Sequence, residues 1–319
     1  MTDAENNNES TVICFAGPNG SGKSTTVMEA VEDYGLPPEA YINADDIAKT
    51  LEGEIADYRE RNIRAAQIAE QRRLAALEAG TDFAFETVMS TPEKVALLTQ
   101  AKAKGYEVAL IFVSTKDPEI NVGRVANRVA LGGHAVEPDA VRDRYWRAHG
   151  LLACAVEQAD AALVHDNSAT NAPHVLVARK LEGRVEFFSY EERDTSWATK
   201  ALETPWRERV ASRSHLLSVM VERAADRGEE PPSAPRQAEA FNGADYMGLV
   251  LAHTDHHVLQ VNARGDYILH DRQLLATEAL KDGAWQCLQY RYSKGKIDRS
   301  GLLAAATPEE KVVSPRPKL

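Results

Sequence analysis

Residues 11–26, TVICFAGPNGSGKSTT, decide the fold of this chain. The β-branched and apolar run at 11–16 predicts a buried strand, and residues 17–24 then fit the pattern G-x-x-x-x-G-K-[ST], with helix-forming sequence after it. A strand, a glycine-rich loop of this spacing and a helix start are together typical of a P-loop. The alternative, a glycine-rich turn with a chance lysine, is disfavoured because motif and context agree.

The chemistry of this loop suits a polyphosphate. Its glycines let successive backbone N–H groups turn inward toward an anion, at a helix N-terminus that carries roughly half a positive charge. Lys23 can reach the β- and γ-phosphates, and the Ser24 hydroxyl can ligate Mg²⁺. The predicted cofactors are therefore ATP and Mg²⁺. The predicted nucleotide site consists of Gly17, Asn19, Gly20, Ser21, Gly22, Lys23, Ser24 and Thr25, with Ser24 as the metal ligand.

Composition narrows the class of protein. The chain has 319 residues, enough for one large and one small domain, and its net charge of −11 argues against a general binder of nucleic acids or anionic membranes. Its three cysteines form no C-x-x-C pair, so neither a zinc site nor a disulfide framework is expected. The polar, acidic N-terminus does not resemble a signal peptide, and no apolar run approaches membrane-spanning length. We expect a cytoplasmic protein.

Strand and helix patterns alternate after the P-loop. This alternation predicts an α/β fold of the P-loop kinase type, with a parallel sheet flanked by helices and closed by a hairpin, followed by a small β-rich C-terminal domain. A proline-rich stretch, GEEPPSAP at 228–235, marks the linker between the two. The predicted organisation is a disordered N-terminus at 1–10, a kinase-type domain at 11–200, a helix at 201–227, a linker at 228–240, the small domain at 241–300 and a disordered tail at 301–319.

Ligands of an open parallel sheet bind at the carboxyl ends of its strands, so polar residues after each predicted strand are candidates. Asp45 could accept the proton of an acceptor hydroxyl, or it could be an ordinary first-turn acid favoured by the helix dipole, and the residues alone leave both open. Glu86 ends an otherwise buried strand, which favours a functional partner. Thr87 could bind the acceptor or, like Ser90, cap the next helix.

Arginines gather on two predicted helices around LGGH at 131–134. Arg124 and Arg128 lie four residues apart on the first helix, and Arg142, Arg144 and Arg147 follow on the second. Two such helices around a glycine hinge could close on a γ-phosphate and neutralise its charge. For any single arginine, a solvated ion pair with a nearby acid is the alternative.

Several stretches occur in an order and spacing that resembles the zeta-toxin family of P-loop kinases. They are GPNGSGKST, YINADDIA, FAFETVMS, GYEVALIFVS, RVANRVALGGHAVEPDAVRDRYWR and VHDNS, within residues 12–189. Characterised members of that family phosphorylate the sugar 3′-hydroxyl of UDP-N-acetylglucosamine. The resemblance implies a kinase with a nucleotide-sugar acceptor, and it leaves open a protein antidote as partner.

Residue by residue, the resemblance implies that Lys23 and Ser24 hold ATP and Mg²⁺, that Asp45 is the base, and that Glu86 helps to hold the acceptor. Arg128 and Arg144 resemble the arginines that embrace the phosphates, and we place Thr87 and Arg124 with the acceptor. The sequence departs from the family at Asn43, where many toxins carry an acid, and around Glu86. These departures bear on acceptor identity and toxicity more than on kinase chemistry.

The stretch ADYMGLVLAHTDHHVLQVNARGDYILHDRQLL is similar to the KfrB-type domain of mobile elements. It has no catalytic motif. Its histidines, His253, His256, His257 and His270, are expected to be exposed rather than metal ligands, because no cysteine or carboxylate spacing completes a recognised site.

Three functional hypotheses remain after this reading. The first is an ATP- and Mg²⁺-dependent kinase of UDP-N-acetylglucosamine. The second is the same fold with a dinucleotide, nucleoside or antibiotic acceptor, and the third is a non-catalytic, ATP-gated interaction protein. The sequence lacks an N-K-x-D guanine motif and an LSGGQ-like segment, which disfavours a GTPase or a transporter ATPase.

Overall fold

A computed structural model of the chain describes residues 10–24, 27, 35–131, 135–292, 296–297 and 303–304. The helix predicted after the P-loop, the glycine hinge at 132–134 and most of both predicted disordered ends lie outside these residues.

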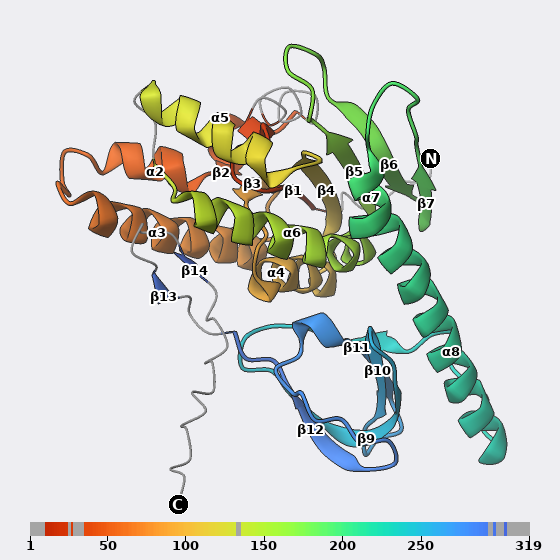
Figure 1. Cartoon of the computed structure of the whole chain (residues 1–319). Coiled ribbons are helices and arrows are strands. Elements are labelled where there is room, and N and C mark those ends of the chain that lie inside the picture. Colours follow the sequence, from red (N-terminus) through yellow and green to blue (C-terminus); the bar gives the residue numbers. More distant parts are fainter. Residues whose placement is uncertain are drawn as a thin grey trace, which may run out of the picture.

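The N-terminal part is built on a seven-stranded mixed sheet in the order β2-β3-β1-β4-β5-β6-β7 (Figure 1). Its first five strands pair in parallel, as predicted, and the hairpin of β6 and β7 adds to β5 in antiparallel. The strands are β1 (Thr11–Ala16), β2 (Tyr41–Ile42), β3 (Phe83–Thr87), β4 (Glu107–Ser114), β5 (Ala161–Asp166), β6 (Val175–Leu181) and β7 (Arg184–Phe187).

Helices alternate with the parallel strands. They are η1 (Pro38–Ala40), α2 (Ala44–Thr50), α3 (Tyr58–Ala79), α4 (Pro92–Ala103), α5 (Pro118–Ala130) and α6 (Pro138–Gln158). One face of the sheet carries side chains such as Cys14, Phe85 and Leu110 and packs against α3, α4 and α6. The opposite face, with Ile13 and Phe15, packs around Val27. Both faces are therefore buried, which explains the continuous apolar character of β1 and β4.

A long helical segment then leads out of the first sheet. It consists of α7 (Ser196–Ala198), a π-helical turn η2 (Thr199–Glu203) and α8 (Thr204–Asp226), so the helix predicted to begin at 201 starts earlier. In Figure 1, α8 runs along the second sheet. Leu216 and Met220 of α8 pack on Leu259 and Leu269 of that sheet.

The C-terminal part is a five-stranded sheet in the order β12-β9-β10-β11-β8. Its elements are β8 (Arg236–Gln237), β9 (Asp245–His253), β10 (His257–Val261), β11 (Tyr267–Asp271), η3 (Arg272–Leu274) and β12 (Trp285–Gln289), with a further pair formed by β13 (Lys296–Ile297) and β14 (Leu303–Ala304). Ile268, Leu274 and Tyr290 share one apolar cluster with α4 and α6. The predicted linker contributes β8 and the buried Ala238 and Ala240, so this module is not the separate unit expected from sequence.

Candidate functional site

The P-loop follows β1 at the carboxyl edge of the sheet, and its backbone needs glycine. Gly17 has φ 142°, and a Cβ there would lie 2.0 Å from the carbonyl oxygen of Val113. Gly22 has φ 95°, and a Cβ would lie 2.2 Å from the Asn167 amide nitrogen. The chain thus uses glycine here for both backbone conformation and close approach, as predicted.

Two asparagines hold the loop from neighbouring elements. The Asn121 amide of α5 donates to the Asn19 carbonyl at 2.6 Å, and the Asn167 amide after β5 donates to the Ser21 carbonyl at 2.8 Å. Asn167 lies in the stretch VHDNS, among the polar residues that follow predicted strands, whereas Asn121 was missed in the sequence. A signal was present, because asparagine is disfavoured inside a helix, and Asn121 lies on the same helix face as the buried Val125.

Lys23 is the centre of charge at this site. Its ammonium is buried, donates to the carbonyls of Gly17 at 2.8 Å and Pro18 at 3.0 Å, and lies 3.7 Å from Oε1 of Glu86. Burial lowers the pKa of Lys23, while the carboxylates of Glu86 and Asp45 act to raise it. The Ser21 hydroxyl beside it is buried without a partner among the described residues. A cation and an orphaned donor inside a glycine loop suit phosphate oxygens.

Acidic groups approach Lys23 from β2, β3 and α2. Asn43 caps α2 by accepting from the Asp45 N–H at 2.8 Å, and its amide donates to the Tyr41 hydroxyl at 2.9 Å. Tyr41 in turn donates to Glu86 at 3.2 Å. Burial, followed by the charge of Glu86, raises the pKa of Tyr41 well above its usual value, so this hydroxyl stays a donor. Asp45 itself is exposed, beside the loop, on the first turn of α2.

The predicted arginines divide into three groups. Arg144 of α6 is buried, with its guanidinium 3.5 Å from Oδ1 of Asn19, and the charge of the exposed Arg128 of α5 acts on the pKa of Lys23. Arg142 and Arg147 form exposed ion pairs with Glu119, Asp139 and Asp143. For these last two, the solvated alternative is confirmed.

Arg124 lies elsewhere in the site. Its guanidinium donates to the Ala169 carbonyl at 3.3 Å, in the loop after β5, and the charge of Asp166 acts on it. Strands β1 and β4 separate β5 from β3, which at the usual strand spacing is about 14 Å. No contact joins Arg124 to Glu86 or Asp45 among the described residues, and its placement with the acceptor stays a prediction.

The remaining predicted residues have simpler surroundings. Thr87 Oγ1 accepts from the N–H of Met89 at 3.1 Å, so this side chain stabilises the turn after β3, while α4 begins after Thr91 rather than Ser90. Ser24 is exposed at the mouth of the loop. Its hydroxyl is an oxygen ligand of the kind that Mg²⁺ prefers. Thr25 lies outside the described residues.

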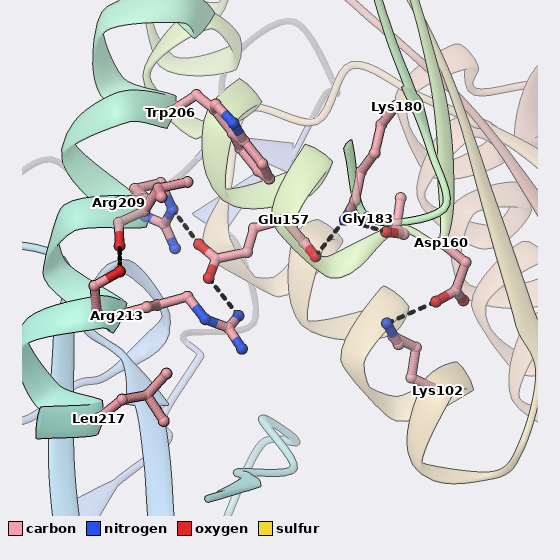
Figure 2. A pocket seen from close by; sticks show the side chains of 12 residues that line it. Lys102, Glu157, Asp160, Lys180, Gly183, Trp206, Arg209, Arg213 and Leu217 are labelled. Atoms are coloured by element: carbon pink, nitrogen blue, oxygen red, sulfur yellow. Dashed lines mark hydrogen bonds and ion pairs between the residues drawn. The ribbon is translucent and has the colours of Figure 1, made fainter. Parts of the chain in front are cut away.

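A second cluster of charged side chains lies between the two sheets. Glu157 of α6 pairs with Arg209 and, at 2.7 Å, with Arg213, both of α8 (Figure 2). Arg209 also pairs with Asp271 of β11, and Glu157 lies 3.1 Å from Nε2 of His257. It borders a pocket of about 460 Å³ whose lining includes Trp206 and Lys180. Glu157, His257 and Asp271 have metal-ligand spacing, but the Arg209 guanidinium bonds both carboxylates and fills that role. The expectation of exposed histidines is wrong for His257 and His270, which are buried.

Comparison with known proteins identifies both parts. Residues 12–150 match the family model of an AAA domain, and residues 245–299 match that of the KfrB domain. Each of these matches covers less than half of the chain. Both domain resemblances drawn from the sequence are thereby confirmed, and the fold is that of a P-loop, kinase-type protein.

The individual proteins that match this chain are only distantly related to it. An uncharacterized protein of Haemophilus influenzae is 29% identical over 138 residues, which cover 42% of this chain and 91% of that protein. Among solved structures, the AvrRxo1-ORF1:-ORF2 complex with ATP matches at TM-score 0.47 and 13% identity, over 56% of this chain and 60% of the other, less than two thirds of its length. The PezAT chromosomal toxin-antitoxin system of Streptococcus pneumoniae matches at TM-score 0.41 and 17% identity, over 61% and 78%. No described helix is both long and apolar enough to cross a membrane.

Proposed function

We propose that this protein is an ATP- and Mg²⁺-dependent phosphotransferase that moves the γ-phosphoryl group to a hydroxyl of a small acceptor, with UDP-N-acetylglucosamine as the first acceptor to test. One observation carries the proposal. Charges from four separate elements, Glu86 of β3, Asp45 of α2, Arg128 of α5 and Arg144 of α6, gather around the P-loop and its Lys23. A nucleotide-binding loop alone does not require an acid on one side and arginines on the other.

The roles follow from the layout. In transfer to an alcohol, the acceptor O–H bond and the bond to the β-phosphate oxygen break as the new P–O bond forms, which gives ADP, a phosphate ester and one proton. In this proposal Asp45 accepts that proton, and Glu86, which accepts a hydrogen bond from Tyr41, also accepts one from a second hydroxyl of the acceptor. Lys23, Arg128 and Arg144 offset the charge on the transferred group, and Mg²⁺ held near Ser24 would add to this.

Arg124 receives a different role. Its place beside the loop after β5 puts it at the other end of the P-loop from Glu86, where the nucleoside of ATP would extend. We assign Arg124 to the nucleotide.

We also propose a protein antidote as a partner, which would act near the exposed Asp45.

The test is incubation with ATP, Mg²⁺ and a panel of nucleotide sugars, nucleosides, dinucleotides and antibiotics, read by mass spectrometry. We expect an added phosphate on one class, abolished in Lys23→Ala and reduced by about 10²-fold or more in Asp45→Asn, the loss expected for a general base. Asp46→Asn, the neighbouring exposed acid paired with Lys49, is the matched control and should retain its rate. Full activity in Asp45→Asn would remove the base assignment.

One observation favours the ATP-gated alternative. Helix α6 carries Arg144 against the P-loop at one end and, at the other, Cys154 and Glu157 against the KfrB domain. A change at the nucleotide could therefore reach that domain through one rigid helix. Acceptor-independent hydrolysis across the whole panel, with a protein partner bound only in the ATP state, would favour this function over the kinase.

A further inference from the structure

Helix α3 places a cation on its buried face. Ala65, Ala69 and Leu77 of this helix are buried, and Arg73 lies four residues after Ala69 and four before Leu77, on the same face. The Arg73 side chain is half-buried, with its guanidinium carbon 5.5 Å from the ring centroid of Phe85 in β3. An inward-facing arginine between alanine and leucine positions requires a compensating group.

Helix α4, which lies beside α3, also carries a cation on its buried face. Lys94 lies four residues before the buried Leu98 and seven before the buried Ala101, so it also faces inward. The positive charge of Arg73 helps burial to lower the pKa of Lys94, which shows that the two cations repel each other. Burial also lowers the pKa of Arg73.

The two cations have no direct counter-ion. Within the described part of the chain, neither side chain forms an ion pair or a hydrogen bond, and Glu70 and Glu93 act on them only from farther away. Three residues before Lys94, the Thr91 hydroxyl is buried without a hydrogen-bond partner among the described residues. Thr91 is the N-cap of α4, yet its side chain makes no capping bond, so a free donor stands at a helix N-terminus.

We propose that Arg73, Lys94, the Thr91 hydroxyl and the N-terminus of α4 form a second anion site, which takes a phosphate or carboxylate group. It is distinct from the P-loop site, because Phe85 points toward α3 and α4 whereas the next residue, Glu86, points toward Lys23 on the other face of β3. Two cationic side chains and a hydroxyl donor, together with a helix N-terminus, match the chemistry of a bound oxyanion. The inference does not depend on the proposed kinase activity.

The test compares thermal unfolding in sodium phosphate and in sodium chloride of equal ionic strength, in a Lys23→Ala background so that the P-loop contributes less. At ten times the dissociation constant, phosphate should raise the midpoint of this parent by about 3 °C over chloride. Lys94→Met should lose this increment, and in chloride it should unfold at a higher temperature than the parent, since the repulsion with Arg73 is gone. Thr91→Val should reduce the increment.

Lys104→Met is the matched control, because Lys104 lies at the exposed end of α4, paired with Glu78. It should keep the full increment. If Lys94→Met kept the increment, or if it lowered the midpoint in chloride, Lys94 would be an ordinary structural residue and the site would be wrong.

The source of the anion is decided separately, with Lys23 intact and phosphate absent. A rise of about tenfold or more in the KM of the acceptor in Lys94→Met, at unchanged KM for ATP, would assign the site to an anionic group of the acceptor. An unchanged acceptor KM, together with the lost phosphate increment, would assign it to a free phosphate compound that binds as an effector.

Discussion

Buried histidines show how strongly individual environments control charge in this chain. His149 of α6 is stacked on Trp197 at a centroid separation of 5.0 Å, and its Nε2 lies 2.7 Å from the Ser114 hydroxyl. Burial lowers its pKa to about 4, lowers that of His165 to about 4 and lowers that of His270 to about 3. At neutral pH these three rings are therefore uncharged.

Stability should therefore fall as pH drops from about 6.5 to 4. In that range the unfolded chain binds protons that the folded histidines do not, so the free energy of unfolding decreases with falling pH by up to about 1.4 kcal/mol per pH unit for each group. Urea unfolding at a series of pH values gives the free energy of unfolding as a function of pH. This free energy should change less steeply with pH in His149→Gln than in the parent. His215→Gln, at an exposed position on α8, is the control. The same pH dependence in His149→Gln as in the parent would contradict the conclusion that burial keeps His149 uncharged.

Individual residues also differ in whether the local sequence pattern reveals their role. Lys23 and Ser24 could be assigned from the motif, because the loop conformation depends on glycines a few residues away. The bonding partners of Asn121 and Tyr41 could not be assigned in this way, because Asn19 and Glu86 are far away from them in the sequence.

Among the elements, the short helix α2 links fold to site. It has only seven residues, and Asn43 both caps it and bonds Tyr41, while Asp45 and Asp46 lie in its first turn. Such a short helix depends on its cap, since few internal hydrogen bonds oppose fraying. Asn43 therefore holds the turn on which Asp45 lies.

Replacing this cap gives a prediction at the scale of the element. Asn43→Ala should lower the free energy of unfolding by about 1 kcal/mol and reduce the rate of phosphoryl transfer, because the first turn loosens. Asn43→Asp keeps a good cap and should retain stability. It is the control that distinguishes the loss of the cap from the loss of the amide that donates to Tyr41. Chemical denaturation and initial rates measure the two effects, and equal losses in both variants would show that the bond to Tyr41 matters instead of the cap.

Strand prediction succeeded at 11–16, where β1 is observed, because that stretch is an apolar run that ends at the glycine loop. Strands β8 and β12 were missed, since β8 has two residues and β12 alternates tryptophan, cysteine and leucine with glutamine. Their pairing with β11 and β9, rather than their own propensity, makes them strands.

At the scale of the whole molecule, the KfrB domain completes the core of the P-loop domain. Ile268, Leu274 and Tyr290 lie in one cluster with α4 and α6, and Arg209 bridges Glu157 and Asp271 across the junction. Nearby charges and hydrogen bonds hold the pKa of Glu157 well below its usual range despite burial. The two domains should therefore unfold together.

Arg209 provides the prediction at this scale. Arg209→Met leaves the buried carboxylates of Glu157 and Asp271 without their shared cation, and it should lower the free energy of unfolding by about 3–5 kcal/mol. Arg213→Met removes the other arginine that pairs with Glu157. Because the Arg213 side chain is 42% exposed, its loss should lower the free energy of unfolding by less than about 1 kcal/mol. Urea unfolding would compare the two. Similar losses would mean that Glu157 alone, not the bridge to Asp271, stabilises the junction.

The sequence by itself determined the P-loop, the α/β class and the presence of a KfrB-like module. Each of these depends on residues close together in the chain, where glycine conformation, apolar periodicity and helix starts act locally. Only the tertiary structure decided that Asp45, Glu86 and Arg144 meet at the P-loop, that Arg124 lies at its other end, and that His257 is buried against Glu157. These contacts depend on the strand order β2-β3-β1-β4-β5 and on how the second sheet docks, which arise from the packing of distant segments rather than from any one of them.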